Sequence, residues 1–148
     1  MSFKEDLEFG EAGERVAWLE LLESPKTKQV LDVRKDKYFQ AKDIDFLQLD
    51  FSNTVNKIEV KTDRKAHETG NIAFETDSNG NVGCLERSEA DYIYYYIEKT
   101  KEVIILKLKE LKGFINHINP REITMGDSAR GYLLNIQMLI DYQVAVRR

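Results

Sequence analysis

The stretch AKDIDFLQLDFSNTVNKIEVKTD, residues 41–63, decides the fold, because it places two apolar strands on either side of a polar, turn-rich segment. We expect the strands at Ile44–Leu49 and Lys57–Lys61. Asp45 lies among the apolar residues of the first strand, and Glu59 and Lys61 lie in the second. A charge in a buried strand is costly unless it is paired, hydrogen-bonded or bound to a metal. These three residues therefore require either mutual pairing or a function.

Strand geometry indicates that the three charged residues come together. Successive side chains of a strand point to opposite faces, so Glu59 and Lys61 face one way and Val60 the other. If the two strands pair, Asp45 comes level with Glu59. Magnesium needs only one or two protein carboxylates and completes its shell with water and phosphate oxygens. The pattern predicts a metal site at Asp45 and Glu59, where Lys61 would stabilise negative charge in the transition state.

The rest of the chain indicates one α+β domain spanning residues 1–148. Its 148 residues are enough for a single core, and no internal repeat or linker is present. The expected elements are a helix at Leu7–Glu23, strands at Lys28–Val33 and Ile72–Thr76, a hairpin formed by residues 90–98 and 101–108, a helix at Leu108–Ile115, a strand near Tyr132–Ile136 and a short C-terminal helix. In the first helix, the apolar residues that recur at spacings of three and four are Phe9, Ala12, Val16, Leu19 and Leu22.

Composition excludes several classes of protein. The chain is 42% hydrophobic and 32% charged, and no apolar run approaches the length of a membrane-spanning helix. The acidic N-terminal segment lacks the pattern of an export signal, so a cytoplasmic location is expected. The single cysteine, Cys84, has no second thiol for a disulfide or a zinc knuckle and is expected to be structural.

The net charge of −4 predicts no general attraction to nucleic acid, so any nucleic-acid contact requires local positive charge. Arg64 and Lys65, just after the second strand, are the first candidates for contacts to backbone phosphates, and Lys35 and Lys37 come next. The tyrosines at 92 and 94–96 are more typical of core packing than of a platform for stacked bases.

Two short motifs resemble the split active-site signature of the PD-(D/E)XK nuclease superfamily: Ile44–Asp45, and IEVK at Ile58–Lys61. Ile44 replaces the proline of the signature, which the family tolerates because the aspartate makes the metal contact. In the first helix, Gly10 and Glu14 are similar to the Gly-x-x-x-Glu pattern of resolvase-like members. The segments TGNIAFE (69–75) and EADYIYYY (89–96) resemble the strand pair that follows the signature.

The resemblance runs from Gly10 to about Tyr96 and implies a restriction endonuclease-like αβββαβ core, with a central mixed sheet flanked by helices. It also implies a DNA endonuclease that depends on Mg²⁺ or Mn²⁺. The metal would be held by Asp45, Glu59, Glu14 and the main-chain carbonyl of Val60, and Lys61 would position the attacking water. A homodimer is a further implication, because cutting two strands requires two sites.

Two alternatives remain. Glu59 and Lys61 would also suit an ordinary ion pair on the solvated face of a hairpin, and Glu14 an ordinary surface position on a helix rich in acids. The protein would then be a non-catalytic relative that acts as a protein- or nucleic-acid-binding module. Asp45 favours the enzymatic interpretation, because aspartate is a poor strand former and its neighbours are apolar.

Overall fold

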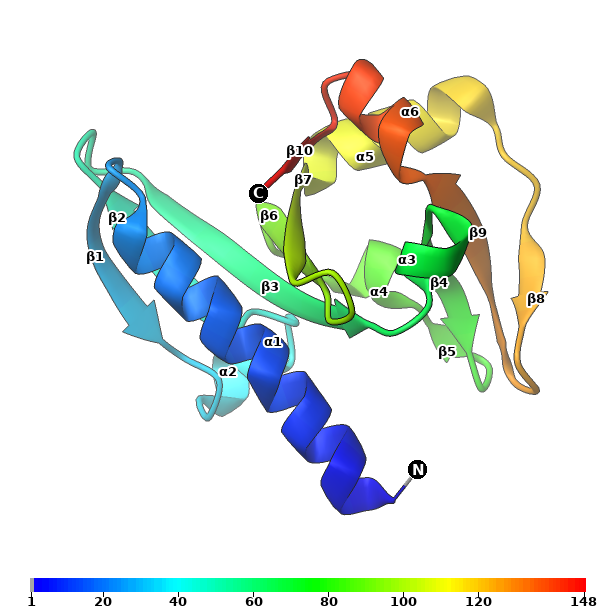
Figure 1. The fold of residues 1–148 in the computed structure, drawn as a ribbon, viewed down its shortest axis with the longest axis horizontal. Coiled ribbons are helices and arrows are strands. Elements are labelled where there is room, and N and C mark those ends of the chain that lie inside the picture. The colour runs from blue at the N-terminus through cyan, green and yellow to red at the C-terminus, as the bar shows by residue number, and fades with distance from the viewer. Residues whose placement is uncertain (1) are drawn as a thin grey trace.

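The two strands that carry the charged residues lie in a six-stranded mixed sheet (Figure 1). The computed structural model describes residues 2–148, and its sheet has the order β1-β2-β3-β6-β7-β10. The bounds are Thr27–Asp32 for β1, Phe46–Asp50 for β2, Val55–Asp63 for β3, Tyr92–Ile97 for β6, Glu102–Lys107 for β7 and Ala145–Arg147 for β10. Strands β3 and β6 are parallel, and the other neighbours are antiparallel. The predicted central mixed sheet is confirmed.

A second, four-stranded sheet has the order β5-β4-β9-β8 and was not predicted. Its strands are β4 (Asn71–Ser78), β5 (Asn81–Val82), β8 (Ile123–Met125) and β9 (Ala129–Asn135). The expectation that the segments now seen as β4 and β6 form a strand pair is wrong. Strand β6 has β3 on one edge and β7 on the other, so β4 finds its backbone partners in β9 and β5.

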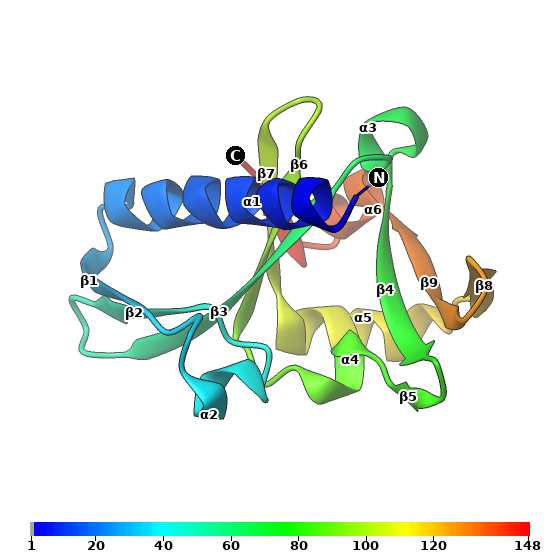
Figure 2. The same ribbon diagram turned by 90° about the horizontal axis from the view of Figure 1, so that it is seen from below.

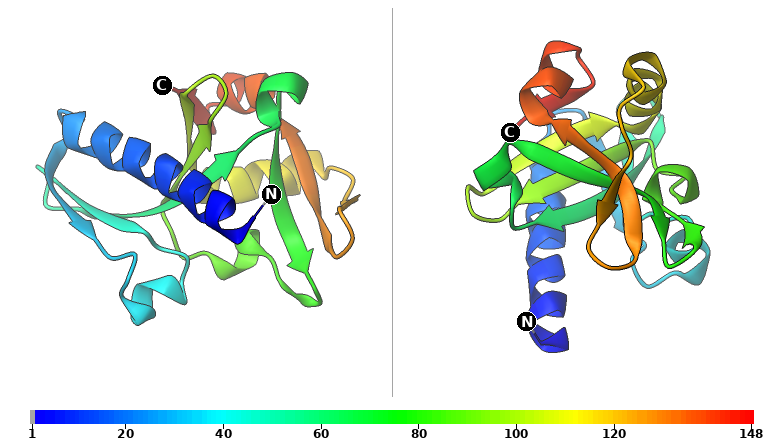
Figure 3. Two further views of the ribbon diagram at one scale, coloured as in Figure 1. Left: turned by 60° about the horizontal axis from the view of Figure 1, so that its bottom comes forward. Right: turned by 90° about the vertical axis from the view of Figure 1, so that its right-hand side faces the viewer.

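Helix α1 (Phe3–Glu23) packs against β1, β3 and β6 (Figure 2). It begins four residues earlier than predicted, because Ser2 and Glu5 form a capping box: the Ser2 Oγ accepts from the Glu5 backbone N–H, and the Glu5 carboxylate accepts from the Ser2 N–H. The first turns of α1 project beyond the six-stranded sheet (Figure 3).

The side of α1 that faces the sheet differs from the apolar stripe predicted from spacing. The buried residues are Gly13, Ala17 and Leu21, whereas Leu19 and Leu22 are about half exposed. Gly13 explains the difference, because a Cβ atom at this position would collide with the Thr62 side chain on β3. The closest approach of helix and sheet therefore selects a glycine-centred face rather than the most apolar one.

The six-stranded sheet has a hydrophobic core on each face, and β6 contributes to both. Tyr94 and Tyr96 pack with α1 residues, whereas Ile93, Tyr95 and Ile97 point into the larger core with β4, β9 and the C-terminal helices. This alternation is the period of a strand buried on both faces. The packing role predicted for these tyrosines is confirmed. The hydroxyl of Tyr95 also donates to Asp63 at 2.6 Å.

The other helices are α2 (Lys37–Gln40), α3 (Ala66–Thr69), α4 (Cys84–Arg87), α5 (Leu108–Ile118) and α6 (Ile136–Asp141). Helices α5 and α6 confirm the two C-terminal helices predicted, and the hairpin of β6 and β7 is also confirmed. The sequence did not predict the one-turn helices or β10. No helix within residues 2–148 has the length and apolar character needed to cross a membrane.

Candidate active site

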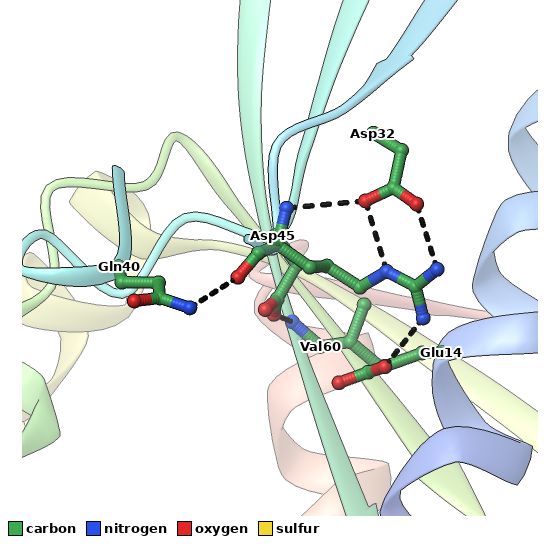
Figure 4. Close-up of polar contacts among 6 residues, drawn as sticks. Glu14, Asp32, Gln40, Asp45 and Val60 are labelled. Atoms are coloured by element: carbon green, nitrogen blue, oxygen red, sulfur yellow. Dashed lines mark hydrogen bonds and ion pairs between the residues drawn. The ribbon is translucent and has the colours of Figure 1, made fainter. Parts of the chain in front are cut away.

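Asp45 lies immediately before β2 and is anchored to the strands on both sides. Its backbone N–H donates to the Ile58 carbonyl at 2.8 Å, and its carbonyl accepts from the Val33 N–H at 3.0 Å. Its carboxylate Oδ2 accepts from the Val60 N–H at 2.7 Å (Figure 4). Phe46 lies opposite Ile58 as the last pair of the β2–β3 register, and Asp45 and Glu59 adjoin this pair on their two segments. The pairing of the two strands, predicted from the sequence, is confirmed.

Burial raises the pKa of Asp45 to about 7, and the negative charges of Glu14 and Glu59 add to the rise. The Val60 N–H and the positive charge of Lys61 act in the opposite direction. Near neutral pH, this carboxyl group is therefore divided between its protonated and ionised forms. A cation at this point would favour the ionised form.

Glu59 is only 5% exposed, which is unusual for a glutamate. Its Oε1 lies 3.2 Å from the Lys61 Nζ, and its Oε2 is buried with no hydrogen-bond partner in residues 2–148. Burial raises the pKa of Glu59, although the Lys61 charge and a hydrogen bond with the buried Ser88 hydroxyl oppose the rise. A buried carboxylate oxygen without a partner is costly, and a bound cation would satisfy it.

Lys61 is the partner of Glu59 and remains partly accessible, with 27% of its side chain exposed. Burial has the largest single effect on the pKa of Lys61 and would lower it, but the charges of Glu59, Cys84 and Asp43 and the hydrogen bond to Glu59 together raise it. Lys61 therefore carries a positive charge at neutral pH, which is the state required to stabilise a developing negative charge.

Helix α4 and the residues after it lie close to this pair, an arrangement that the sequence did not predict. The positive charge of Lys61 and the negative charge of Glu59 both act on Cys84, although burial has the largest effect and raises the pKa of its thiol. Two ion pairs hold this segment to the turn before Asp45, one from Arg87 to Asp43 at 2.7 Å and one from Lys42 to Glu89 at 2.8 Å. Cys84 is buried and unpaired, in agreement with a structural role.

Glu14 lies on the α1 side of Asp45, near enough for its charge to raise the pKa of Asp45, and Arg34 holds the Glu14 carboxylate (Figure 4). The Arg34 Nη1 lies 2.7 Å from the Glu14 Oε2, and its Nε and Nη2 contact Asp32 (Figure 4). The sequence did not single out Arg34 or Asp32. Asp32 and Arg34 lie at and just after the end of β1, outside the two short motifs. No local sequence pattern indicates that this end of β1 reaches α1.

The donor set fits a hard divalent cation held by few protein ligands. Within residues 2–148, no three Asp, Glu, His or Cys side chains come together closely enough to hold a metal ion. Magnesium does not require three, because water and substrate phosphate complete its shell. Asp45 and Glu59 offer carboxylate oxygens, and one of these, the Glu59 Oε2, has no other partner in the described residues.

The residues predicted to contact nucleic acid lie further along the chain, after β3. The Arg64 guanidinium lies 3.6 Å from the centre of the Phe9 ring and makes an ion pair with Asp6 at 3.3 Å, so it bridges to α1. Lys65 is exposed at the start of α3. Contacts from Arg64 and Lys65 to phosphate remain predictions.

No protein-family model matches this chain, and no curated protein matches it in sequence. Among solved structures, the chain is similar to that of a bacterial homing endonuclease, I-Ssp6803I. The two superpose with a TM-score of 0.52 at 16% sequence identity, over 85% of this chain and 72% of the other. The similarity shows a shared fold and agrees with the predicted nuclease-like α+β class.

Proposed function

We propose that this protein is a magnesium-dependent DNA endonuclease of the PD-(D/E)XK type, which hydrolyses phosphodiester bonds. The observation that carries the proposal is the pairing of β2 with β3, which leaves Asp45 and Glu59 beside the same register pair, together with a buried Glu59 Oε2 that has no hydrogen-bond partner in residues 2–148. The fold shared with a homing endonuclease supports the proposal. A homodimer would supply the second site needed to cut both strands of a duplex.

Asp45, Glu59 and the Val60 carbonyl would hold the metal, with Glu14 as an additional acid. When bound, magnesium would polarise the phosphoryl oxygen and lower the pKa of a coordinated water. The Val60 N–H fixes one oxygen of Asp45 and so orients this carboxylate. The Lys61 ammonium, held by Glu59, would position the attacking water and stabilise negative charge as it develops.

Replacing Lys61 with alanine tests the assignment of this amine. Wild-type protein is expected to cut plasmid or branched DNA only when magnesium is present. We expect Lys61→Ala to cut at least about a hundredfold more slowly, because the charge that stabilises the transition state is lost. The measurement is the initial rate of cleavage on both substrates with magnesium and with a chelator.

Lys57→Ala, on the same strand, is the matched control and should cut at close to the wild-type rate. A wild-type rate in Lys61→Ala would remove Lys61 from the mechanism. If wild-type protein cuts neither substrate with magnesium or manganese, the proposed function is wrong.

Asp45→Asn tests the electrostatic cost of the site. Without metal, we expect the variant to be more stable than wild type at about pH 8, by roughly 1–3 kcal/mol. Asp45 has a pKa of about 7 in the folded protein against 3.8 for the free side chain, so folded wild type loses stability as pH rises between these values. Asparagine does not ionise, and its amide oxygen can still accept from Val60. The difference should disappear at about pH 4, where aspartate is largely neutral in the folded state.

The measurement is urea unfolding of both proteins at these two pH values in the presence of a chelator. Asp127→Asn, which removes a charge from an exposed turn, is the control. If Asp45→Asn and wild type are equally stable at the higher pH, ionised Asp45 is not destabilised by burial and by the charges of Glu14 and Glu59.

One observation favours the second candidate, a non-catalytic binding module. Glu14 and Glu59 already have positively charged partners, Arg34 and Lys61. An acid that already pairs with a cationic side chain has less need of a metal. The candidates differ in thermal stability, because a metal bound only by the folded state raises the melting temperature. No shift with magnesium or manganese, with or without DNA, would favour the binding module.

A further inference from the structure

We infer that Arg34 is a positioning residue for the metal site, acting through Glu14; the inference rests on the proposed function. Arg34 follows β1, and its guanidinium connects two acids from different elements. Its Nε lies 2.9 Å from the Asp32 Oδ1, its Nη2 2.7 Å from the Asp32 Oδ2, and its Nη1 2.7 Å from the Glu14 Oε2. The end of β1 is thereby joined to the middle of α1.

The Arg34 side chain is held on several sides before it reaches Glu14. The two contacts to Asp32 form a bidentate pair, which sets the plane of the guanidinium. The same group lies over the Phe46 ring, 5.4 Å from its centre, and the Arg34 carbonyl accepts from the Gln40 side chain at 2.6 Å. Phe46 follows Asp45 directly. The arginine is therefore fixed relative to the strand that carries the proposed metal ligand.

This arrangement orients Glu14 without cancelling its charge. Arg34 holds one oxygen of Glu14, and the other lies on the side of Asp45 (Figure 4). Asp32 and Glu14 each carry one negative charge and Arg34 one positive charge, so one negative charge remains beside Asp45. The cluster can thus still attract a cation, and it offers that cation an oxygen with a defined orientation.

A purely structural role for the Arg34–Glu14 ion pair would contribute little to the stability of the protein. The side chains of Arg34 and Glu14 are 36% and 27% exposed, and ion pairs with this degree of exposure contribute little to stability. Residues that orient the ligands of a metal site, in contrast, commonly change metal affinity by tenfold or more. The two roles therefore predict different results when metal binding and stability are measured separately.

The test measures Mn²⁺ affinity by titration calorimetry on wild type, Arg34→Ala, Arg34→Lys, Glu14→Gln and the double variant Arg34→Ala/Glu14→Gln. We expect Arg34→Ala to bind about tenfold more weakly and Arg34→Lys to lie between it and wild type. Lysine keeps the charge but cannot make the bidentate contact with Asp32. Because Arg34 acts through Glu14, the double variant should bind no more weakly than Glu14→Gln alone.

Arg147→Ala is the control, because Arg147 makes a similar ion pair with Glu102 at 2.6 Å, near the opposite edge of the sheet. Its Mn²⁺ affinity should equal that of wild type. Two results would overturn the inference but leave the proposed function intact. One is a wild-type Mn²⁺ affinity in folded Arg34→Ala. The other is a loss of Mn²⁺ affinity from Arg34→Ala that is the same in the wild-type and Glu14→Gln backgrounds. Absence of Mn²⁺ binding by wild type would overturn the proposed function together with the inference.

Discussion

Glu59→Gln is expected to lower the rate of magnesium-dependent DNA cleavage by about a thousandfold, the largest effect on activity that we predict for any single site. The substitution keeps the shape of the side chain but removes its charge and replaces one carboxylate oxygen with an amide nitrogen, which cannot bind a cation. It also leaves Lys61 without its counter-ion. Cleavage rates at saturating magnesium, compared with wild type, measure the effect.

The same variant should no longer be stabilised by metal. At a magnesium concentration about a hundredfold above its dissociation constant, a site present only in the folded state adds about 2.7 kcal/mol to stability. Wild type should gain this stability and Glu59→Gln should gain little. Glu102→Gln is the matched control, because Glu102 is also a strand glutamate in an ion pair. If metal stabilises Glu59→Gln as it does wild type, Glu59 is not a ligand.

Phe74→Ala is expected to reduce the free energy of unfolding by about 3–5 kcal/mol, a large part of the typical stability of a domain. Phe74 is fully buried in β4, and its ring centre lies 6.0 Å from that of Tyr95 in β6. The residue thus joins the four-stranded sheet to the six-stranded one through a common core. Truncation leaves a cavity between the two sheets.

Because the sheets share this core, we expect wild type to unfold in a single transition. The measurement is unfolding in urea, monitored by circular dichroism and by tyrosine fluorescence. Leu133→Ala is the control: Leu133 lies on β9 of the same sheet but is 49% exposed, so the change should alter stability by less than about 0.5 kcal/mol. Two separate transitions in wild type would show that the four-stranded sheet is an independent unit.

Local patterns in the sequence were sufficient to predict those strands whose buried face is determined by residues close together in the chain. The alternation of apolar residues predicted β2, β3 and their pairing, which leaves Asp45 and Glu59 beside the register pair of Phe46 and Ile58. The same alternation in the tyrosine-rich segment predicted its packing role, which the two cores confirm. In these strands, residues close in the sequence determine which face is buried.

Long-range contacts decided the rest. Spacing alone favoured the wrong side of α1, because the close approach of Gly13 to Thr62 involves a strand far along the chain. The family resemblance implied a pair formed by the segments of β4 and β6, but β3 and β7 occupy the two edges of β6. Arg34 had no local signal at all.

The sequence by itself determined the composition of the candidate site: an acid just before one strand, and an acid and an amine that share a face of the next strand because of its period of two. Only the tertiary structure decided their surroundings, namely that Glu59 is almost fully buried and that Arg34 holds Glu14 beside Asp45. The physical reason is that a strand period depends on bonds within the chain, whereas burial and ion pairing depend on which distant segments compete for the same space.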